Sequence, residues 1–306
     1  MNLRNSLLLL LLIITVSCKN EPKKVDTQSS YLIDIDVFKE ISNTSNIKII
    51  DFRKPHLYVK GHIKGAINIW RTDIEDASYP YGGMMAPKEQ IEKLFSKLGI
   101  QTTDTLILYD DNGLCDSSRL WWILQNYNFT NVKLLNGGIE SWRAIEGSLT
   151  NEVPVLEPTL FKLPKESSYK YHISKEQMFS GVLGDVTILD TRSTDEFSGK
   201  YQKKGAFKGG RIPRSQLIDW AHAIDYNGTR KIKSVKELSD IYKGLTSSKN
   251  DTIIVYCHSG VRSAHTTFVL TQLLGYKNVL NYDGSWTEWS YFDNLPFEKD
   301  SLTTKK

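Results

Sequence analysis

The sequence of 306 residues has few of the groups that stabilise small or metal-dependent folds. Three cysteines, Cys18, Cys115 and Cys257, are too few for a disulfide scaffold, and no C-x-x-C or H-E-x-x-H spacing offers a metal site. The 39 basic and 35 acidic residues give a net charge of +4, without a basic cluster dense enough for a nucleic-acid partner. We therefore expect no metal and no nucleic acid, and any catalysis must come from a few isolated side chains.

The first eighteen residues are typical of an export signal. Arg4 precedes an unbroken apolar run over residues 7–14, which is too short to cross a bilayer. The following Thr15-Val16-Ser17-Cys18 resembles a bacterial lipobox, in which the cysteine is lipidated and becomes the new N-terminus. We expect residues 1–17 to be a signal peptide and Cys18 to anchor the protein to a bacterial envelope membrane, facing the periplasm or the exterior. A plain secretory signal and an uncleaved anchor are the alternatives.

The rest of the chain contains a tandem repeat. Tyr109-Asp110 aligns with Tyr256-Cys257 at a spacing of 147 residues. The same spacing aligns glycines and tryptophans further along, namely Gly113 with Gly260, Gly137 with Gly284, and Trp142 with Trp289. Upstream, Asp51-Phe52-Arg53 aligns with Asp190-Thr191-Arg192 at a different spacing, which places insertions in loops between fixed elements. This pattern indicates a duplicated domain.

Each copy alternates short apolar runs with helical segments. In the second copy, residues 187–189 and 252–256 have the continuous apolar pattern of strands in a parallel sheet, and residues 263–274 have that of a helix. The alternation predicts an α/β fold of two tandem domains, each a parallel sheet flanked by helices. We divide the chain after the signal peptide as follows: tether 18–30, first domain 31–150, linker 151–171, second domain 172–297 and tail 298–306.

In the second copy, a cysteine stands where a strand ends and a helix begins. The loop reads Cys257-His258-Ser259-Gly260-Val261-Arg262-Ser263. We expect successive backbone N–H groups and the positive end of the helix to point at the sulfur of Cys257. Gly260 lets the backbone curl, and Arg262 adds a fixed positive charge. Together these features predict a lowered thiol pKa and a nucleophilic thiolate at neutral pH.

This loop, Asp190-Thr191-Arg192 and the segment Asp283-Gly284-Ser285-Trp286-Thr287-Glu288-Trp289 resemble the catalytic half of a tandem rhodanese, a thiosulfate sulfurtransferase. The first copy resembles the inactive half of that family, and the resemblance spans about residues 31–297. It implies that Cys257 takes a sulfane sulfur from thiosulfate as a persulfide and passes it to a thiophilic acceptor, cyanide or a thiol. The implied partners are small molecules, and we expect a monomer without an organic cofactor.

The resemblance also implies roles for the neighbours of Cys257. The amides of the loop would hold the persulfide, with substrate-binding positions His258, Ser259, Gly260, Val261, Arg262 and Ser263. Arg262 would bind the sulfonate end of the donor. Asp190 and Arg192 would brace the loop from behind. We expect His258 to shape the mouth of the pocket rather than act as a base, because a thiolate stabilised by amides and Arg262 needs none.

Three other functions are alternatives to a thiosulfate sulfurtransferase. Dual-specificity phosphatases have five residues between cysteine and arginine, whereas four separate Cys257 from Arg262, which argues against a phosphatase. A 3-mercaptopyruvate sulfurtransferase remains open: such enzymes lack the loop arginine and carry carboxylate-binding arginines, and Glu196 stands at one of those positions, but Lys203, Lys204 or Arg211 offers a replacement. A non-catalytic, envelope-anchored sensor or scaffold is the third alternative.

The first copy has lost the nucleophile. Asp110 stands where the second copy has Cys257, and Cys115 stands where it has Arg262. We expect the Asp110 carboxylate to cap a ring of amides, because it cannot carry sulfur. We expect Cys115 to be a small buried residue, with a reactive thiol as the alternative.

Overall fold

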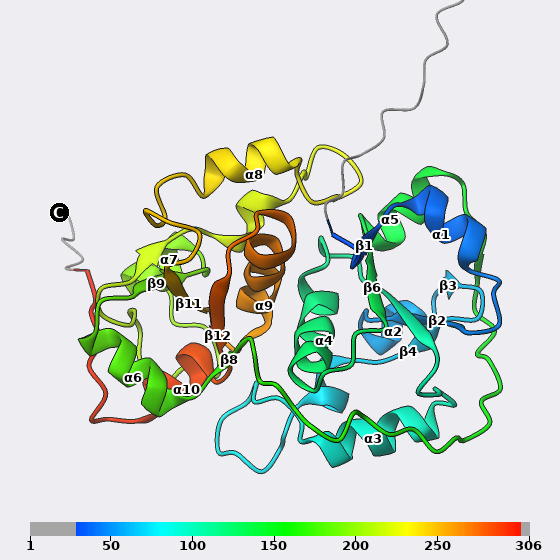
Figure 1. Ribbon diagram of the computed structural model, residues 1–306, viewed down its shortest axis with the longest axis horizontal. Coiled ribbons are helices and arrows are strands. Elements are labelled where there is room, and N and C mark those ends of the chain that lie inside the picture. The colour runs from blue at the N-terminus through cyan, green and yellow to red at the C-terminus, as the bar shows by residue number, and fades with distance from the viewer. Residues whose placement is uncertain (1–28, 301–306) are drawn as a thin grey trace, which may run out of the picture.

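The computed structural model describes residues 29–300, which form two α/β units built on sheets of the same strand order (Figure 1). The first sheet has the order β1-β6-β5-β2-β4 and the second the order β8-β12-β11-β9-β10, with every neighbouring pair parallel. Each strand of the first sheet therefore has a counterpart at the same place in the second. The predicted fold class, two tandem α/β domains with parallel sheets flanked by helices, is confirmed.

The elements of the first unit follow the alternation expected from its sequence. They are β1 (Leu32–Ile33), α1 (Ile35–Ile41), β2 (Ile47–Asp51), α2 (Pro55–Tyr58), β3 (His62–Ile63), β4 (Ile67–Asn68), the 3₁₀ helix η1 (Arg71–Ile74), α3 (Lys88–Lys97), β5 (Thr105–Tyr109), α4 (Cys115–Asn126), β6 (Val132–Leu135), α5 (Gly138–Ala144) and β7 (Leu149–Thr150). β3 and β7 form a separate antiparallel pair.

The second unit repeats this series. Its elements are β8 (His172–Ile173), α6 (Lys175–Leu183), β9 (Thr187–Asp190), α7 (Thr194–Ser198), β10 (Gln216–Leu217), the 3₁₀ helix η2 (Trp220–Ala223), α8 (Val235–Ile241), β11 (Thr252–Tyr256), α9 (Val261–Phe268), the π-helical turn η3 (Val269–Leu273), β12 (Asn278–Tyr282) and α10 (Ser285–Tyr291). Three of its helices, α6, α7 and α8, begin with a serine capping box.

The central strands are buried on both faces, as their continuous apolar sequences predict. In β11, Ile253 and Val255 enter one apolar cluster, while Ile254 and Tyr256 enter another on the opposite face of the sheet. Alternate residues of a strand point to opposite faces, so each face needs its own covering helices. This burial fixes where β11 ends and therefore where the loop after it begins.

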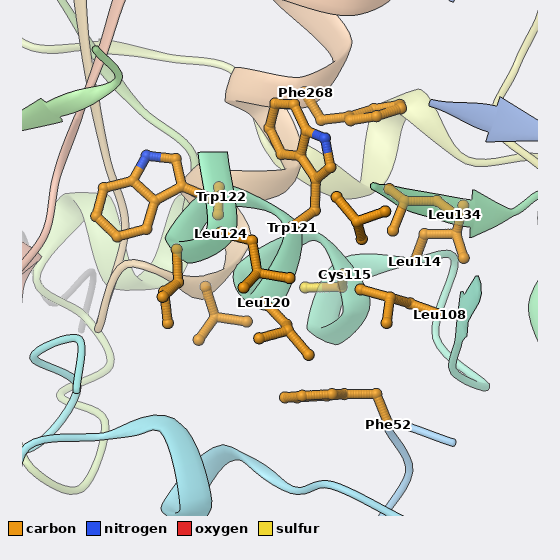
Figure 2. Packing of buried hydrophobic residues seen from close by; sticks show 14 of the residues in the cluster. Phe52, Leu108, Leu114, Cys115, Leu120, Trp121, Trp122, Leu124, Leu134 and Phe268 are labelled. Carbon is orange, nitrogen blue, oxygen red and sulfur yellow. The ribbon is translucent and has the colours of Figure 1, made fainter. Parts of the chain in front are cut away.

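The two units share a core at the centre of the molecule, where α4 faces α9 (Figure 1). Trp121 of α4 meets Phe268 of α9 edge to face, with ring centroids 4.9 Å apart. Figure 2 shows this contact beside Cys115, which lies among apolar side chains of the first unit. The continuous core holds the two units against each other, so side chains of one can reach the loop of the other.

Residues 151–171 contain no helix or strand and run along α3 of the first unit. The Thr159 N–H donates to the Ser96 carbonyl at 2.9 Å, and Phe161 packs edge to face on Phe95 at 5.0 Å. Among the described residues, no helix is long and apolar enough to cross a membrane. Cys18 and the predicted signal peptide lie outside the described residues.

Candidate active site

The candidate nucleophile lies at the carboxyl end of the central strand of the second sheet. β11 ends at Tyr256, Cys257 follows, and α9 begins at Val261. The helix starts two residues earlier than the sequence pattern predicts, because Gly260 turns the chain at φ +75° and lets Val261 and Arg262 form its first turn. A Cβ at Gly260 would lie 2.6 Å from the Asp283 carbonyl oxygen, so this turn requires glycine.

The surroundings of Cys257 favour its thiolate. The residue is 1% exposed. Burial alone would raise the pKa of the thiol, but the charge of Arg262 and the backbone N–H groups of Ser263 and Ser259 lower this pKa below its usual value. The predicted direction of the pKa shift is therefore the one that the geometry produces.

Ser285 supports the loop from behind. Its Oγ accepts hydrogen bonds from the backbone N–H of Cys257 at 3.2 Å and of Gly260 at 3.0 Å. The N–H of Trp286 donates to the Cys257 carbonyl at 3.0 Å. The expectation that every amide from His258 to Ser263 surrounds the sulfur is therefore wrong for Gly260, because Ser285 takes its N–H.

Arg262 and Glu196 form a two-pronged ion pair at the site. The Arg262 Nη1 and Nη2 atoms donate to Glu196 Oε2 and Oε1 at 2.7 and 2.8 Å. Burial alone would raise the pKa of Glu196, but the hydrogen bonds and charge of Arg262 lower it to about 2. Arg262 thus keeps its charge beside Cys257, while its paired terminal nitrogens already have a partner. The expectation that Arg262 binds the sulfonate end of a donor stays a prediction, because the ion pair uses only one N–H of each terminal nitrogen.

Asp190 and Arg192 hold the strand ends rather than the loop itself. Arg192 Nη2 donates to Asp190 Oδ2 at 2.6 Å and to the Gly210 carbonyl at 2.8 Å. The guanidinium also lies 4.8 Å from the centre of the Trp286 ring. Because Trp286 bonds to Cys257 through its backbone, the pair supports the loop only through this intermediate. Ser285, by contrast, contacts the loop directly.

Two further residues, His258 and Lys203, lie close to Cys257. His258 is 8% exposed, and its Nε2 lies 3.1 Å from the Lys204 carbonyl oxygen. Burial, followed by the charges of Lys203 and Arg262, lowers the pKa of His258 to about 4, so the ring is neutral at pH 7. Burial also lowers the pKa of Lys203, whose charge acts on Cys257. With a pKa of about 4 the neutral ring is a weak base, and the expectation that His258 shapes the mouth of a pocket stays a prediction.

The equivalent loop of the first unit is closed by its own carboxylate. Asp110 Oδ1 accepts the N–H groups of Asn112 and Leu114, and Oδ2 accepts those of Asp116 and Ser117, all at 2.9 Å. Asp110 therefore caps a ring of four amides, as expected. Burial and the charge of Asp116 raise its pKa to about 6.

The equivalent of Arg262 in the first unit, Cys115, is 1% exposed. Burial raises its pKa well above the usual value for a thiol, so it is a small core residue rather than a thiolate.

A model of the rhodanese-like domain matches residues 34–145 and again residues 176–291. The chain belongs to the rhodanese family. Each of the two matched segments contains one of the two loops, so the rhodanese domain that carries Cys257 and the one that carries Asp110 are copies of one another.

Curated relatives support a sulfurtransferase but differ in name. The "Sulfur carrier protein TtuD" of Thermus thermophilus is 34% identical over 279 residues, covering 88% of this chain and 96% of the relative. A Mycobacterium tuberculosis protein provisionally named thiosulfate sulfurtransferase SseA is 34% identical over 247 residues, covering 78% of this chain and 80% of the relative.

Solved structures agree on the rhodanese fold. The 3-mercaptopyruvate sulfurtransferase SseA of Escherichia coli aligns with a TM-score of 0.74 at 25% identity, covering 84% of this chain and 99% of that one. EanB in complex with ergothioneine aligns with a TM-score of 0.77 at 20% identity, covering 89% of this chain and 70% of that one. The second likeness shows the fold alone.

Sequence reasoning missed two residues of the site. The contact of Ser285 with the loop was not expected, although Ser285 lies within the Asp283–Trp289 segment that carries the resemblance. Glu196 was noted for its position, but not as the partner of Arg262. Its only local signal was the capping box with Ser193 that starts α7.

Proposed function

We propose that this rhodanese-family protein transfers the outer sulfur of thiosulfate through a persulfide on Cys257. The Cys257 thiolate attacks that sulfur, the sulfur–sulfur bond of thiosulfate breaks, and sulfite leaves with the bonding electron pair. Cyanide or a thiolate then attacks the terminal sulfur of the persulfide and releases the Cys257 thiolate. The observation that carries the proposal is the lowered pKa of Cys257 between β11 and α9, beside the charge of Arg262.

The identity of the sulfur donor is argued from the charges near Cys257. Thiosulfate is a dianion, and both Lys203 and Arg262 supply positive charge near Cys257. The ion pair with Glu196 uses two of the five N–H donors of Arg262, so we assign the sulfonate end of the donor to Lys203, the loop amides and the other N–H donors of Arg262. Mercaptopyruvate is the second candidate, because Lys203 can equally bind a carboxylate and the structure of a 3-mercaptopyruvate sulfurtransferase aligns with 99% of its length.

The test is a side-by-side assay of the two donors with cyanide, following thiocyanate. We expect turnover with either donor to require Cys257. Thiosulfate should give the higher kcat/KM. Mass spectrometry after donor treatment should find one added sulfur on Cys257. Activity that survives in Cys257→Ala would refute the proposal, and a preference for mercaptopyruvate would replace the donor. A complete absence of turnover with either donor would favour the non-catalytic sensor or scaffold.

We also propose that the protein is a monomer held at a bacterial envelope membrane by a lipid on Cys18. The support is the sequence Thr15-Val16-Ser17-Cys18 after an apolar run. Labelling with a lipid precursor in a bacterial host should mark the wild type and not Cys18→Ala. Equal labelling of both would refute the anchor, and light scattering of the detergent-free soluble portion reports the oligomeric state.

A further inference from the structure

We propose that Arg119, which lies in the domain without a nucleophile, is a positioning residue for the loop of Cys257. The inference rests on the proposed role of Cys257 as the nucleophile. Arg119 belongs to α4, and its side chain is 2% exposed. Its Nη2 donates to Asp283 Oδ1 at 2.5 Å, and its Nη1 lies 3.5 Å from the carbonyl oxygen of Gly260. One side chain of the first domain therefore contacts the loop itself, at the Gly260 carbonyl, and also Asp283, which follows β12.

The orientation of the Gly260 carbonyl determines how the loop enters α9. It also accepts hydrogen bonds from Asn281 Nδ2 at 3.1 Å and from the Ala264 N–H at 3.2 Å. A peptide unit is planar, so fixing this oxygen fixes the direction of the next N–H, that of Val261, and with it the first turn of α9. That turn carries Arg262 and the Ser263 amide, two of the groups that lower the pKa of Cys257.

Arg119 also binds the segment of the first domain that lies over the loop. Its Nη2 donates to the Gly83 carbonyl at 2.7 Å, and the Met85 N–H donates to Asp283 Oδ2 at 3.0 Å. A Cβ on Gly83 would lie 2.5 Å from the Cβ of Ser259, so this segment rests directly on the loop. Asp283 balances the charge of the buried guanidinium, and the Trp122 ring lies 4.6 Å from it.

The two domains do not contact each other's loops through equivalent residues. At the spacing of 147 residues, the counterpart of Arg119 in α9 is Thr266, whose hydroxyl donates to the Arg262 carbonyl of its own helix. The counterpart of Gly260 is Gly113, which faces the apolar side chain of Ile224. The second domain contacts the first domain's loop through other side chains, because Arg230 donates to the Asp111 carbonyl and His265 lies at the backbone of Gly113. What is particular to Arg119 is that one guanidinium contacts the cysteine loop, Asp283 and the segment over the loop together.

The experiment compares Arg119→Met, Arg119→Lys and the control Tyr81→Phe in the full chain. The control removes another buried hydrogen bond between the domains, from Tyr81 to Glu288 Oε1 at 2.8 Å, without touching the loop. The pKa of Cys257 is read from the pH dependence of its alkylation by iodoacetamide, resolved by peptide mass spectrometry. This readout needs no sulfur donor, so its outcome is separate from that of the donor assay.

We expect Arg119→Met to raise the pKa of Cys257 by about one unit and to lower kcat about tenfold with a smaller change in KM. Arg119→Lys keeps the charge but cannot reach three oxygens at once, so it should shift the pKa in the same direction by less. If Arg119→Met does not fold, Arg119→Lys carries the test. A folded variant of either kind with the wild-type alkylation profile overturns the proposal, as does an equal shift in Tyr81→Phe.

Discussion

The two loops at the ends of the central strands are built alike and filled differently. In the first domain the Asp110 carboxylate occupies the ring of amides and accepts four N–H groups. In the second domain a thiol stands at the same place, supported by Ser285, whose counterpart is Gly138. The same fold thus uses one loop to satisfy its own amides and keeps the amides of the other near a sulfur atom.

The side chains next to the two loops also differ. Arg262 and Glu196 form an ion pair beside Cys257, whereas their counterparts in the first domain are Cys115 and Leu57. At these two positions, a charged pair stands beside the thiolate, whereas small or apolar side chains stand beside the enclosed carboxylate. The domain without a nucleophile therefore also lacks the counterpart of the Arg262–Glu196 ion pair.

The largest expected effect comes from making the second loop like the first. In Cys257→Asp the new carboxylate can accept the loop amides as Asp110 does, but it cannot form a persulfide. We expect sulfur transfer to fall more than about 1000-fold, while the free energy of unfolding changes by less than about 1 kcal/mol. A donor assay and urea unfolding measure the two quantities. A large loss of stability would mean that the two rings of amides are not equivalent.

Removing the Asp110 carboxylate from the first domain should lower the free energy of unfolding. Asp110→Ala leaves four buried N–H groups without an acceptor, and we expect a loss of about 3 to 5 kcal/mol in the free energy of unfolding. Because the folded pKa of Asp110 is about 6, above its value in an unfolded chain, this carboxyl stabilises the fold as the pH falls from about 6 towards 4. Urea unfolding at several pH values should show that this dependence is lost in Asp110→Ala. An unchanged midpoint would contradict the capping role.

Much of this arrangement could be predicted from the sequence because it is local. The apolar run of β11, the cysteine after it and Gly260 lie within a few residues of one another, and the aligned repeat alone identifies Asp110 as the replaced nucleophile. The pairing of Arg262 with Glu196 joins residues 66 positions apart. It depends on how α7 packs near α9, which no local pattern encodes.

The prediction that all amides of the Cys257 loop face the sulfur was wrong for a similar reason. Local chain geometry predicts where the N–H groups of a loop point, but it does not reveal a competing acceptor from another element. The Oγ of Ser285 is such an acceptor, and it takes the N–H of Gly260. Side chains brought in by the start of α10 and by the other domain therefore decide the details of the site that a local sequence pattern does not predict.

The ion pair of the catalytic loop should give the next largest effect. Removing the charge in Glu196→Gln leaves Arg262 buried without its carboxylate, and we expect a loss of about 2 kcal/mol at pH 7. The folded pKa of Glu196 is about 2, below its unfolded value, so its contribution is complete above pH 4.5 and is lost as the pH falls towards 2.

Urea unfolding between pH 7 and pH 3 checks this prediction. The wild type should lose stability through Glu196 below about pH 4.5, whereas Glu196→Gln should lose less over the same range. Glu237, which is capped by Ser234 on the surface of α8, offers the matched control Glu237→Gln. Identical pH dependence in the wild type and Glu196→Gln would show that the pair contributes nothing to folding.

The smallest effect is expected at the cysteine of the first domain. Cys115 is buried among apolar side chains (Figure 2), and its pKa is raised, so it stays a thiol when Cys257 is a thiolate. Cys115→Ala should therefore change kcat/KM less than about twofold and lower the free energy of unfolding by about 1 kcal/mol through the cavity left behind. In the folded wild type, iodoacetamide should label Cys257 and spare Cys115. Loss of sulfur transfer in Cys115→Ala, with the fold intact, would mean that the first domain keeps a chemical role and that the contrast between the two loops is incomplete.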